Sequence, residues 1–167
     1  KQLHQEVSRL SNAFIAAGIG KGDKVATLLA NSLELWETYW ACAAIGAVAV
    51  PLSPLLRGEG LFNLLDNSDT KLVITSQNLT EHVDAIRKRL KNIPPNNYWI
   101  TDDVEDGFKN YHTQKQQHPA EPTAVADVTG DDLYNIIYSS GTTGLPKGIV
   151  ISHEVRALYG SLFANAY

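Results

Sequence analysis

A stretch rich in hydroxyl groups and glycines, near the end of the chain, carries the residue types best suited to chemistry. It reads Tyr-Ser-Ser-Gly-Thr-Thr-Gly-Leu-Pro-Lys-Gly over residues 138–148, with four serine or threonine hydroxyls, three glycines and one lysine. Glycines allow backbone N–H groups to converge on a ligand, hydroxyls donate to anionic oxygens, and lysine adds positive charge. Pro146 stiffens the turn that presents Lys147. The pattern predicts a loop that binds a chain of phosphates.

The segments on either side predict that two strands hold this loop. Residues 133–138 are β-prone, and residues 149–151 are β-branched and apolar. The stretch is not a Walker loop, because Pro146 precedes the lysine and Gly148 follows it. No helix follows directly, so a helix N-terminus is not the main anion trap. The competing interpretation is a hairpin that is rich in glycine, serine and threonine by chance.

Residues 138–148 resemble the phosphate-loop signature of the adenylate-forming (AMP-binding) superfamily. That superfamily includes acyl- and aryl-CoA synthetases, firefly luciferase and the adenylation domains of peptide synthetases. Residues 20–32 and 44–54 are similar to early strands and turns of the same family. The departures are mild, since Ser139 stands where the family often has threonine and Ser53 where asparagine is common before proline. The resemblance covers nearly the whole chain, but only the early portion of a family member.

The resemblance implies a two-step reaction. A carboxylic acid attacks the α-phosphorus of ATP to give an acyl-adenylate and pyrophosphate, and a thiol, usually that of coenzyme A, then takes the acyl group. ATP, Mg²⁺ and coenzyme A are the implied cofactors, with Lys147 as the catalytic residue and the Mg²⁺ ligand left open. The residues expected to bind the phosphates are Ser139, Ser140, Gly141, Thr142, Thr143, Gly144 and Lys147.

The chain is expected to be one partial domain, truncated at both ends. The family's adenine and ribose site, acyl pocket, metal-binding glutamate and mobile C-terminal domain would lie beyond Tyr167. We therefore expect the parent protein to be an acid–CoA ligase and these 167 residues alone to be inactive. The alternative is a stand-alone nucleotide- or phosphate-binding module without ligase activity, and an ATP-hydrolysing enzyme or kinase is a weaker third choice. The length of the parent chain would discriminate between the first two.

Composition narrows the class of protein. With 44% hydrophobic and 19% charged residues, the 167-residue chain has an ordinary globular composition. A net charge of −4 and a pI near 5.7 argue against a nucleic-acid or membrane-surface binder. The longest apolar run, residues 39–52, is too short to span a membrane. The single cysteine, Cys42, is expected in the core, and the absence of an internal disulfide or signal peptide predicts a cytoplasmic location.

Helical and strand patterns alternate along the chain. Strands are predicted to begin near Lys24, Ala47, Lys71 and Tyr98, with helices between them. This alternation predicts an α/β fold, a mostly parallel β-sheet flanked by helices, as part of the large N-terminal domain of an adenylate-forming enzyme. Residues 102–129 are polar and are predicted to form a long surface connection with one short helix.

The helix predicted after the first strand carries an apolar stripe. Asn31 and Glu34 have the spacing of a capping box. An apolar stripe follows at helical spacing, made of Leu33, Trp36, Trp40 and Ala43 or Ala44. We expect this stripe to lie in the core, in preference to forming a stacking platform. The five histidines lack metal-ligand spacing. His153 follows the strand that leaves the loop, where a surface role at a helix N-terminus or a packing role is expected in preference to catalysis.

Overall fold

The computed structural model describes residues 2–103, 106–122, 127–139 and 146–166, with side chains up to residue 162. The helices are α1 (Gln2–Ala16), α2 (Leu33–Ile45), α3 (Gly58–Asn67), α4 (Thr80–Arg87), α5 (Tyr111–Gln116) and α6 (His153–Ala166), with 3-10 turns η1 (Gln77–Leu79) and η2 (Pro95–Asn97). The strands are β1 (Lys24–Leu28), β2 (Val48–Leu52), β3 (Thr70–Thr75), β4 (Tyr98–Ile100), β5 (Lys109–Asn110), β6 (Leu133–Ser139) and β7 (Lys147–Ser152).

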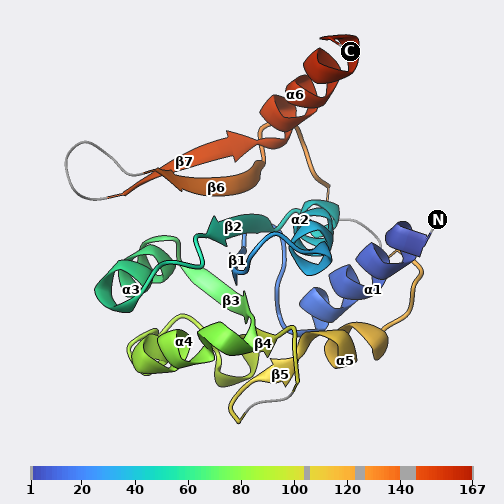
Figure 1. The fold of residues 1–167 in the computed structure, drawn as a ribbon. Coiled ribbons are helices and arrows are strands. Elements are labelled where there is room, and N and C mark those ends of the chain that lie inside the picture. The colour runs from blue at the N-terminus through green and yellow to red at the C-terminus, as the bar shows by residue number, and fades with distance from the viewer. Residues whose placement is uncertain (1, 104–105, 123–126, 140–145, 167) are drawn as a thin grey trace.

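All these strands join one sheet with the order β5-β4-β3-β1-β2-β6-β7. Neighbouring strands pair in parallel from β5 to β6, and β7 alone among the described strands runs antiparallel, as the partner of β6. Parallel strands need crossover connections, and helices supply most of them here. The predicted α/β fold with a mostly parallel sheet flanked by helices is confirmed, with strands near the four predicted starts (Figure 1).

Successive residues of each central strand face opposite sides of the sheet, so two separate cores form. Val25 and Ala49 pack with α1, α2 and Tyr111 of α5 on one face, in a cluster completed by Leu10, Phe14, Ala41, Cys42, Leu72 and Trp99. Ala26 and Val50 pack with α3 and α4 on the other face, together with Leu28, Leu61, Leu65, Val73, Val83, Ile86 and Ile100. The predicted core position of Cys42 is confirmed, since its side chain is fully buried.

Helix α2 differs from its sequence-based prediction in two ways. Ser32, not Asn31, is its N-cap residue, and the Ser32 hydroxyl accepts from the Leu35 N–H at 3.3 Å. The large side chains of the stripe expected in the core are exposed, with Leu33 at 61%, Trp36 at 59% and Trp40 at 49% of their accessible surface. The prediction of a buried stripe was wrong because α2 is apolar on both sides and packs through its smaller residues.

A buried ion-pair cluster occupies the packed side of α2. Glu37 is 2% exposed and Lys115 of α5 is 5% exposed, and the Lys115 Nζ lies 2.9 Å from Glu37 Oε2. The hydroxyl of the fully buried Tyr111 donates to the same oxygen at 2.8 Å, and Glu6 of α1 lies 2.8 Å from Lys115. Burial alone would lower the pKa of Lys115, but Glu6 and Glu37 raise it more, so the ammonium form is favoured.

This cluster binds part of the 102–129 segment to the core. Besides Tyr111 and Lys115, the segment supplies the carbonyl of His118 to the Arg9 side chain at 2.7 Å. It also supplies the carbonyl of Pro119 to the Asn12 side chain at 2.9 Å. The described residues of this polar segment therefore contribute a strand, a helix and buried side chains to the fold.

Candidate phosphate-binding site

The two described ends of the predicted phosphate loop lie on the paired strands β6 and β7. Ser139 ends β6 and Lys147 begins β7, and the two residues pair directly across the ladder, next to the pair Tyr138 and Gly148. Strands on both sides of the loop are therefore as the sequence predicts. The other predicted phosphate-binding residues lie outside the described part of the chain; they are Ser140, Gly141, Thr142, Thr143 and Gly144.

Ser139 and Lys147 are placed so that both can reach one ligand. Directly paired residues of an antiparallel ladder have Cβ atoms about 4.5–5.5 Å apart. The Ser139 side chain is half-buried, whereas Lys147 is exposed and forms no ion pair with the described residues. The arrangement presents a hydroxyl and an uncommitted ammonium group at one end of the sheet, which suits an anionic ligand.

Asp132 fixes the opposite end of the hairpin, just before β6. Its carboxylate lies 2.8 Å from the Nζ of Lys21 and accepts from the backbone N–H of Thr129 at 2.6 Å. The Lys21 ammonium and the Thr129 N–H lower the pKa of Asp132 to about 2. The Asp132 carbonyl also accepts from the His153 N–H at 2.9 Å. Asp132 thus connects the base of the hairpin to the turn after α1 and to the start of α6.

The hairpin and α6 stand out from the rest of the molecule (Figure 1). A cavity of about 820 Å³ separates α6 from α2 and is lined mainly by aromatic rings and small residues, with Arg156 and His153 as its basic members. Trp36 and Trp40 line it from α2, and Tyr134 lines it from β6. Helical spacing in the sequence located these tryptophans on one face, but gave no sign that the face would be open.

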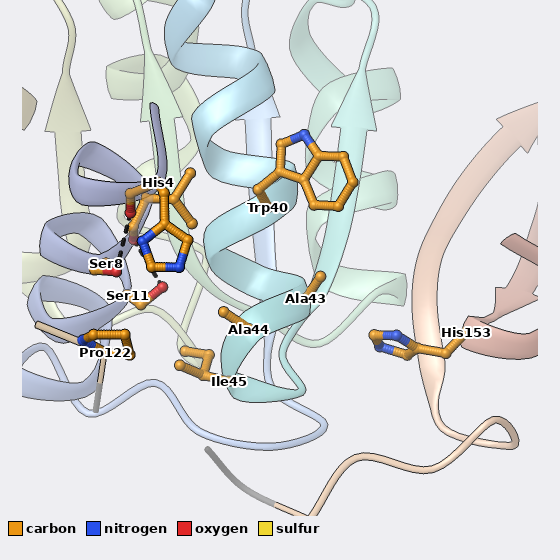
Figure 2. A pocket seen from close by; sticks show the side chains of 10 residues that line it. His4, Ser8, Ser11, Trp40, Ala43, Ala44, Ile45, Pro122 and His153 are labelled. Atoms are coloured by element: carbon orange, nitrogen blue, oxygen red, sulfur yellow. Dashed lines mark hydrogen bonds between the residues drawn. The ribbon is translucent and has the colours of Figure 1, made fainter. Parts of the chain in front are cut away.

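His153 lies at the edge of this cavity and of a smaller one next to α1. In Figure 2 its ring points from the start of α6 toward Ala43 of α2, while His4 of α1 lies across the smaller cavity, of about 400 Å³. Its ring meets that of Tyr134 edge-on at 5.3 Å, and burial lowers its pKa, which favours the neutral form. Its ring thus packs on Tyr134 at the N-terminal end of α6.

The described residues offer neither a metal site of the usual kind nor a membrane span. No group of three or more histidine, cysteine, aspartate or glutamate side chains in the described ranges could hold a metal ion. None of the helices in those ranges combines the length and the apolar composition that crossing a bilayer requires.

Comparisons with known proteins match almost the whole chain to CoA ligases and acyl-CoA synthetases. The crotonobetaine/carnitine–CoA ligase of Escherichia coli O6:K15:H31 is 35% identical over 99% of this chain, which spans 32% of that enzyme. The anthranilate CoA ligase AuaEII, solved in complex with anthranoyl-AMP, matches 96% of the chain with a TM-score of 0.90 and 25% identity. The Mycobacterium tuberculosis fatty acyl CoA synthetase matches 92% with a TM-score of 0.78 and 32% identity.

The chain spans about a third of the length of these relatives, with 31% of the anthranilate ligase and 28% of the fatty acyl synthetase covered. The family described as "AMP-binding enzyme" matches residues 1–165, which is nearly the entire sequence. The family resemblance carried by residues 138–148 is confirmed by this match: the chain belongs to the AMP-binding enzyme family.

Proposed function

We propose that this chain is the N-terminal part of an AMP-forming acid–CoA ligase. The parent protein converts a carboxylic acid and ATP into an acyl-adenylate and pyrophosphate and then transfers the acyl group to coenzyme A. The observation that carries the proposal is the pairing of Ser139 with Lys147 at the tip of the hairpin, in a chain of the AMP-binding family. The anthranoyl-AMP bound to the anthranilate ligase is an adenylate of the proposed kind.

The proposed chemistry suits a site made of donors and one cation. A carboxylate substrate is ionised at neutral pH and is its own nucleophile, so the protein need not supply a base. The protein must instead stabilise the charge that develops on pyrophosphate as it leaves. We assign this to Lys147 and to the donors at Ser139 and at residues 140–144. Mg²⁺ would neutralise phosphate charge there, with a hydroxyl of the same motif as the candidate protein ligand.

The exposed apolar surface supports the proposal that these residues belong to a larger enzyme. Among the described residues, eleven of the fourteen exposed large hydrophobic side chains lie on α2, β6, β7 or α6. Exposed apolar side chains that gather on neighbouring elements mark contact sites on folded proteins. In a ligase of the relatives' length, the remaining two thirds of the chain could pack on these exposed side chains. A cytoplasmic location is part of the proposal and rests on the buried, unpaired Cys42 thiol.

Exchange of labelled pyrophosphate into ATP by the full-length protein tests the proposal. Exchange should require a carboxylic acid, and the acids named in the relatives form the first panel: crotonobetaine, carnitine, anthranilate and fatty acids. A protein that binds ATP but exchanges no pyrophosphate with any of these acids would favour a nucleotide-binding module instead.

Lys147→Ala provides the sharper test of the site. Losing one charge-stabilising contact in the transition state costs about 2–4 kcal/mol, so adenylation should slow roughly 30- to 1,000-fold. Folding should be unaffected, because Lys147 is exposed and unpaired among the described residues. Lys91→Ala, another exposed lysine, is the matched control. Thiol transfer, measured separately by rapid mixing, should slow much less, and adenylation by Lys147→Ala at the wild-type rate would refute the assignment.

A further inference from the structure

Tyr138, the first residue of the phosphate-loop motif, is connected to a residue far from it in the sequence. Its hydroxyl donates to Oδ1 of Asn67 at 2.7 Å. Asn67 is the last residue of α3 and lies 71 positions before Tyr138. Burial raises the pKa of Tyr138 above its usual value, so at neutral pH the hydroxyl keeps the proton that it donates.

The position of this bond along β6 is what gives it importance. The ladder between β2 and β6 consists of one pair, Ala49 with Asn135. Tyr138 lies three residues further toward the loop, which is about 10 Å along a strand. Side-chain hydrogen bonds join the described part of β6 to the body of the protein, and among them the Tyr138–Asn67 bond therefore lies nearest the loop. Pro146, on the other side of the loop, borders a cavity of about 390 Å³ with Asn67 and the neighbouring residues of α3.

Gly148 lets the Tyr138 ring take this position. The two residues are opposite each other in the hairpin, and a Cβ at Gly148 would lie 3.3 Å from the ring carbon Cε1 of Tyr138. It would also lie 3.1 Å from Cγ2 of Ile136. Both distances are shorter than ordinary contacts, so a side chain at 148 would push the ring away. The ring also packs against the core cluster beneath α3, which holds it from the other side.

We propose that Asn67 is a positioning residue for the phosphate site. Through Tyr138 it fixes the tip of the hairpin, where Ser139 and Lys147 pair, relative to the body of the domain. This inference rests on the proposed function, because a fixed lysine is useful only if the hairpin binds phosphate. The Asn67 side chain itself touches no substrate. It restricts the orientations of the hairpin tip before ATP binds, so less conformational entropy is lost on binding.

The first experiment measures the hairpin directly, by amide hydrogen exchange of the full-length protein. Asn67→Leu and Tyr138→Phe each remove the bond, and neither leaves a buried polar atom behind, because the bond itself is exposed. Residues 133–139 and 147–152 should exchange about two- to tenfold faster, the factor that one hydrogen bond of ordinary strength represents. Asn67→Asp keeps the acceptor oxygen and should restore protection. Asn63→Leu, one turn earlier on α3 and also exposed, is the matched control.

The second experiment measures the affinity of the same proteins for ATP with Mg²⁺ by calorimetry. Asn67→Leu and Tyr138→Phe should each raise the Kd about two- to tenfold. The double variant should be no weaker than either single variant, because Asn67 acts only through Tyr138. Melting temperatures serve to separate this effect from general destabilisation.

Each result decides one claim. Unchanged hairpin exchange in Asn67→Leu, or wild-type ATP affinity in a variant whose hairpin has loosened, would overturn the positioning role. If the wild-type protein itself fails to bind ATP, the proposed function fails and the role in phosphate binding falls with it. The exchange experiment would then still report whether Asn67 fixes the hairpin.

Discussion

Replacing Lys115 by methionine should be among the most destabilising single changes in this fold. The ammonium group is the cationic partner of Glu37, and both side chains are almost completely buried. In Lys115→Met the Glu37 carboxylate keeps only the Tyr111 hydroxyl, at 2.8 Å, as a hydrogen-bond donor among the described residues. Removing one member of a buried ion pair costs about 3–5 kcal/mol, a large part of the roughly 5–15 kcal/mol that stabilises a typical domain. The melting temperature of a chain of this size should fall by roughly 6–20 °C.

Urea denaturation of the 167-residue chain, followed by circular dichroism, measures this loss. Two further variants show whether the isolated charge is its cause. Lys115→Met combined with Glu37→Gln removes both charges while keeping an acceptor for Tyr111, so it should recover part of the stability. Arg89→Met breaks the exposed Arg89–Glu59 pair and should leave the urea midpoint almost unchanged, because water and salt screen exposed ion pairs. A loss in Lys115→Met as small as that in Arg89→Met would refute the reasoning.

Three further outcomes are expected. Acrylamide should quench most of the tryptophan fluorescence of the 167-residue chain. It should quench little of the fluorescence of a Trp36→Phe/Trp40→Phe variant, because the remaining Trp99 is 1% exposed. Strong quenching in that variant would contradict the exposure of Trp36 and Trp40 on α2. The low pKa of Asp132 means that the unfolded chain binds a proton near pH 4 and the folded chain only near pH 2. This contribution to stability is therefore complete above about pH 4 and lost as the pH falls to about 2. The urea midpoint of Lys21→Met should therefore fall less between about pH 4 and about pH 2 than that of the wild type. An equal fall would count against the Lys21–Asp132 pair. Finally, the 167-residue chain alone should not catalyse pyrophosphate exchange, and detectable exchange would show that the active site is elsewhere than proposed.

The sheet could be predicted from the sequence because each of its central strands is marked by a pattern of neighbouring residues. Each of the central strands is a short apolar run between turn residues, and the runs alternate with helical patterns. Alternation of this kind permits few topologies other than a parallel sheet with helices on its faces. The two strands beside the phosphate loop were predictable for the same reason. The glycine and hydroxyl pattern between them identifies the candidate site from residue types and spacing alone.

The orientation of α2 could not be predicted, because two of its residues violate the usual rule for burial. Glu37 lies inside, which is favourable only because Lys115 and Tyr111 approach it from a segment more than 70 positions away. Trp36 and Trp40 lie outside, although their size and spacing are those of core residues. The sequence of a helix that is apolar on both sides does not show which side packs on the core. Long-range ion pairing then determines which side is buried. The burial of Tyr111 could not be predicted for a related reason, since Tyr111 stands in a polar stretch that resembles a surface connection.

Motif residues also depend on partners that the motif cannot reveal. The pattern at residues 138–148 suggests which side chains could meet phosphate, but the hairpin that carries them shares only one ladder pair with β2. Its orientation is set at two ends, by Lys21 and Asp132 at the base and by Asn67 and Tyr138 near the tip. Lys21 and Asn67 lie outside the loop, and the sequence of the loop gives no sign that either residue positions it. Substitutions at these two positions should therefore alter the phosphate site while leaving every residue of its motif unchanged.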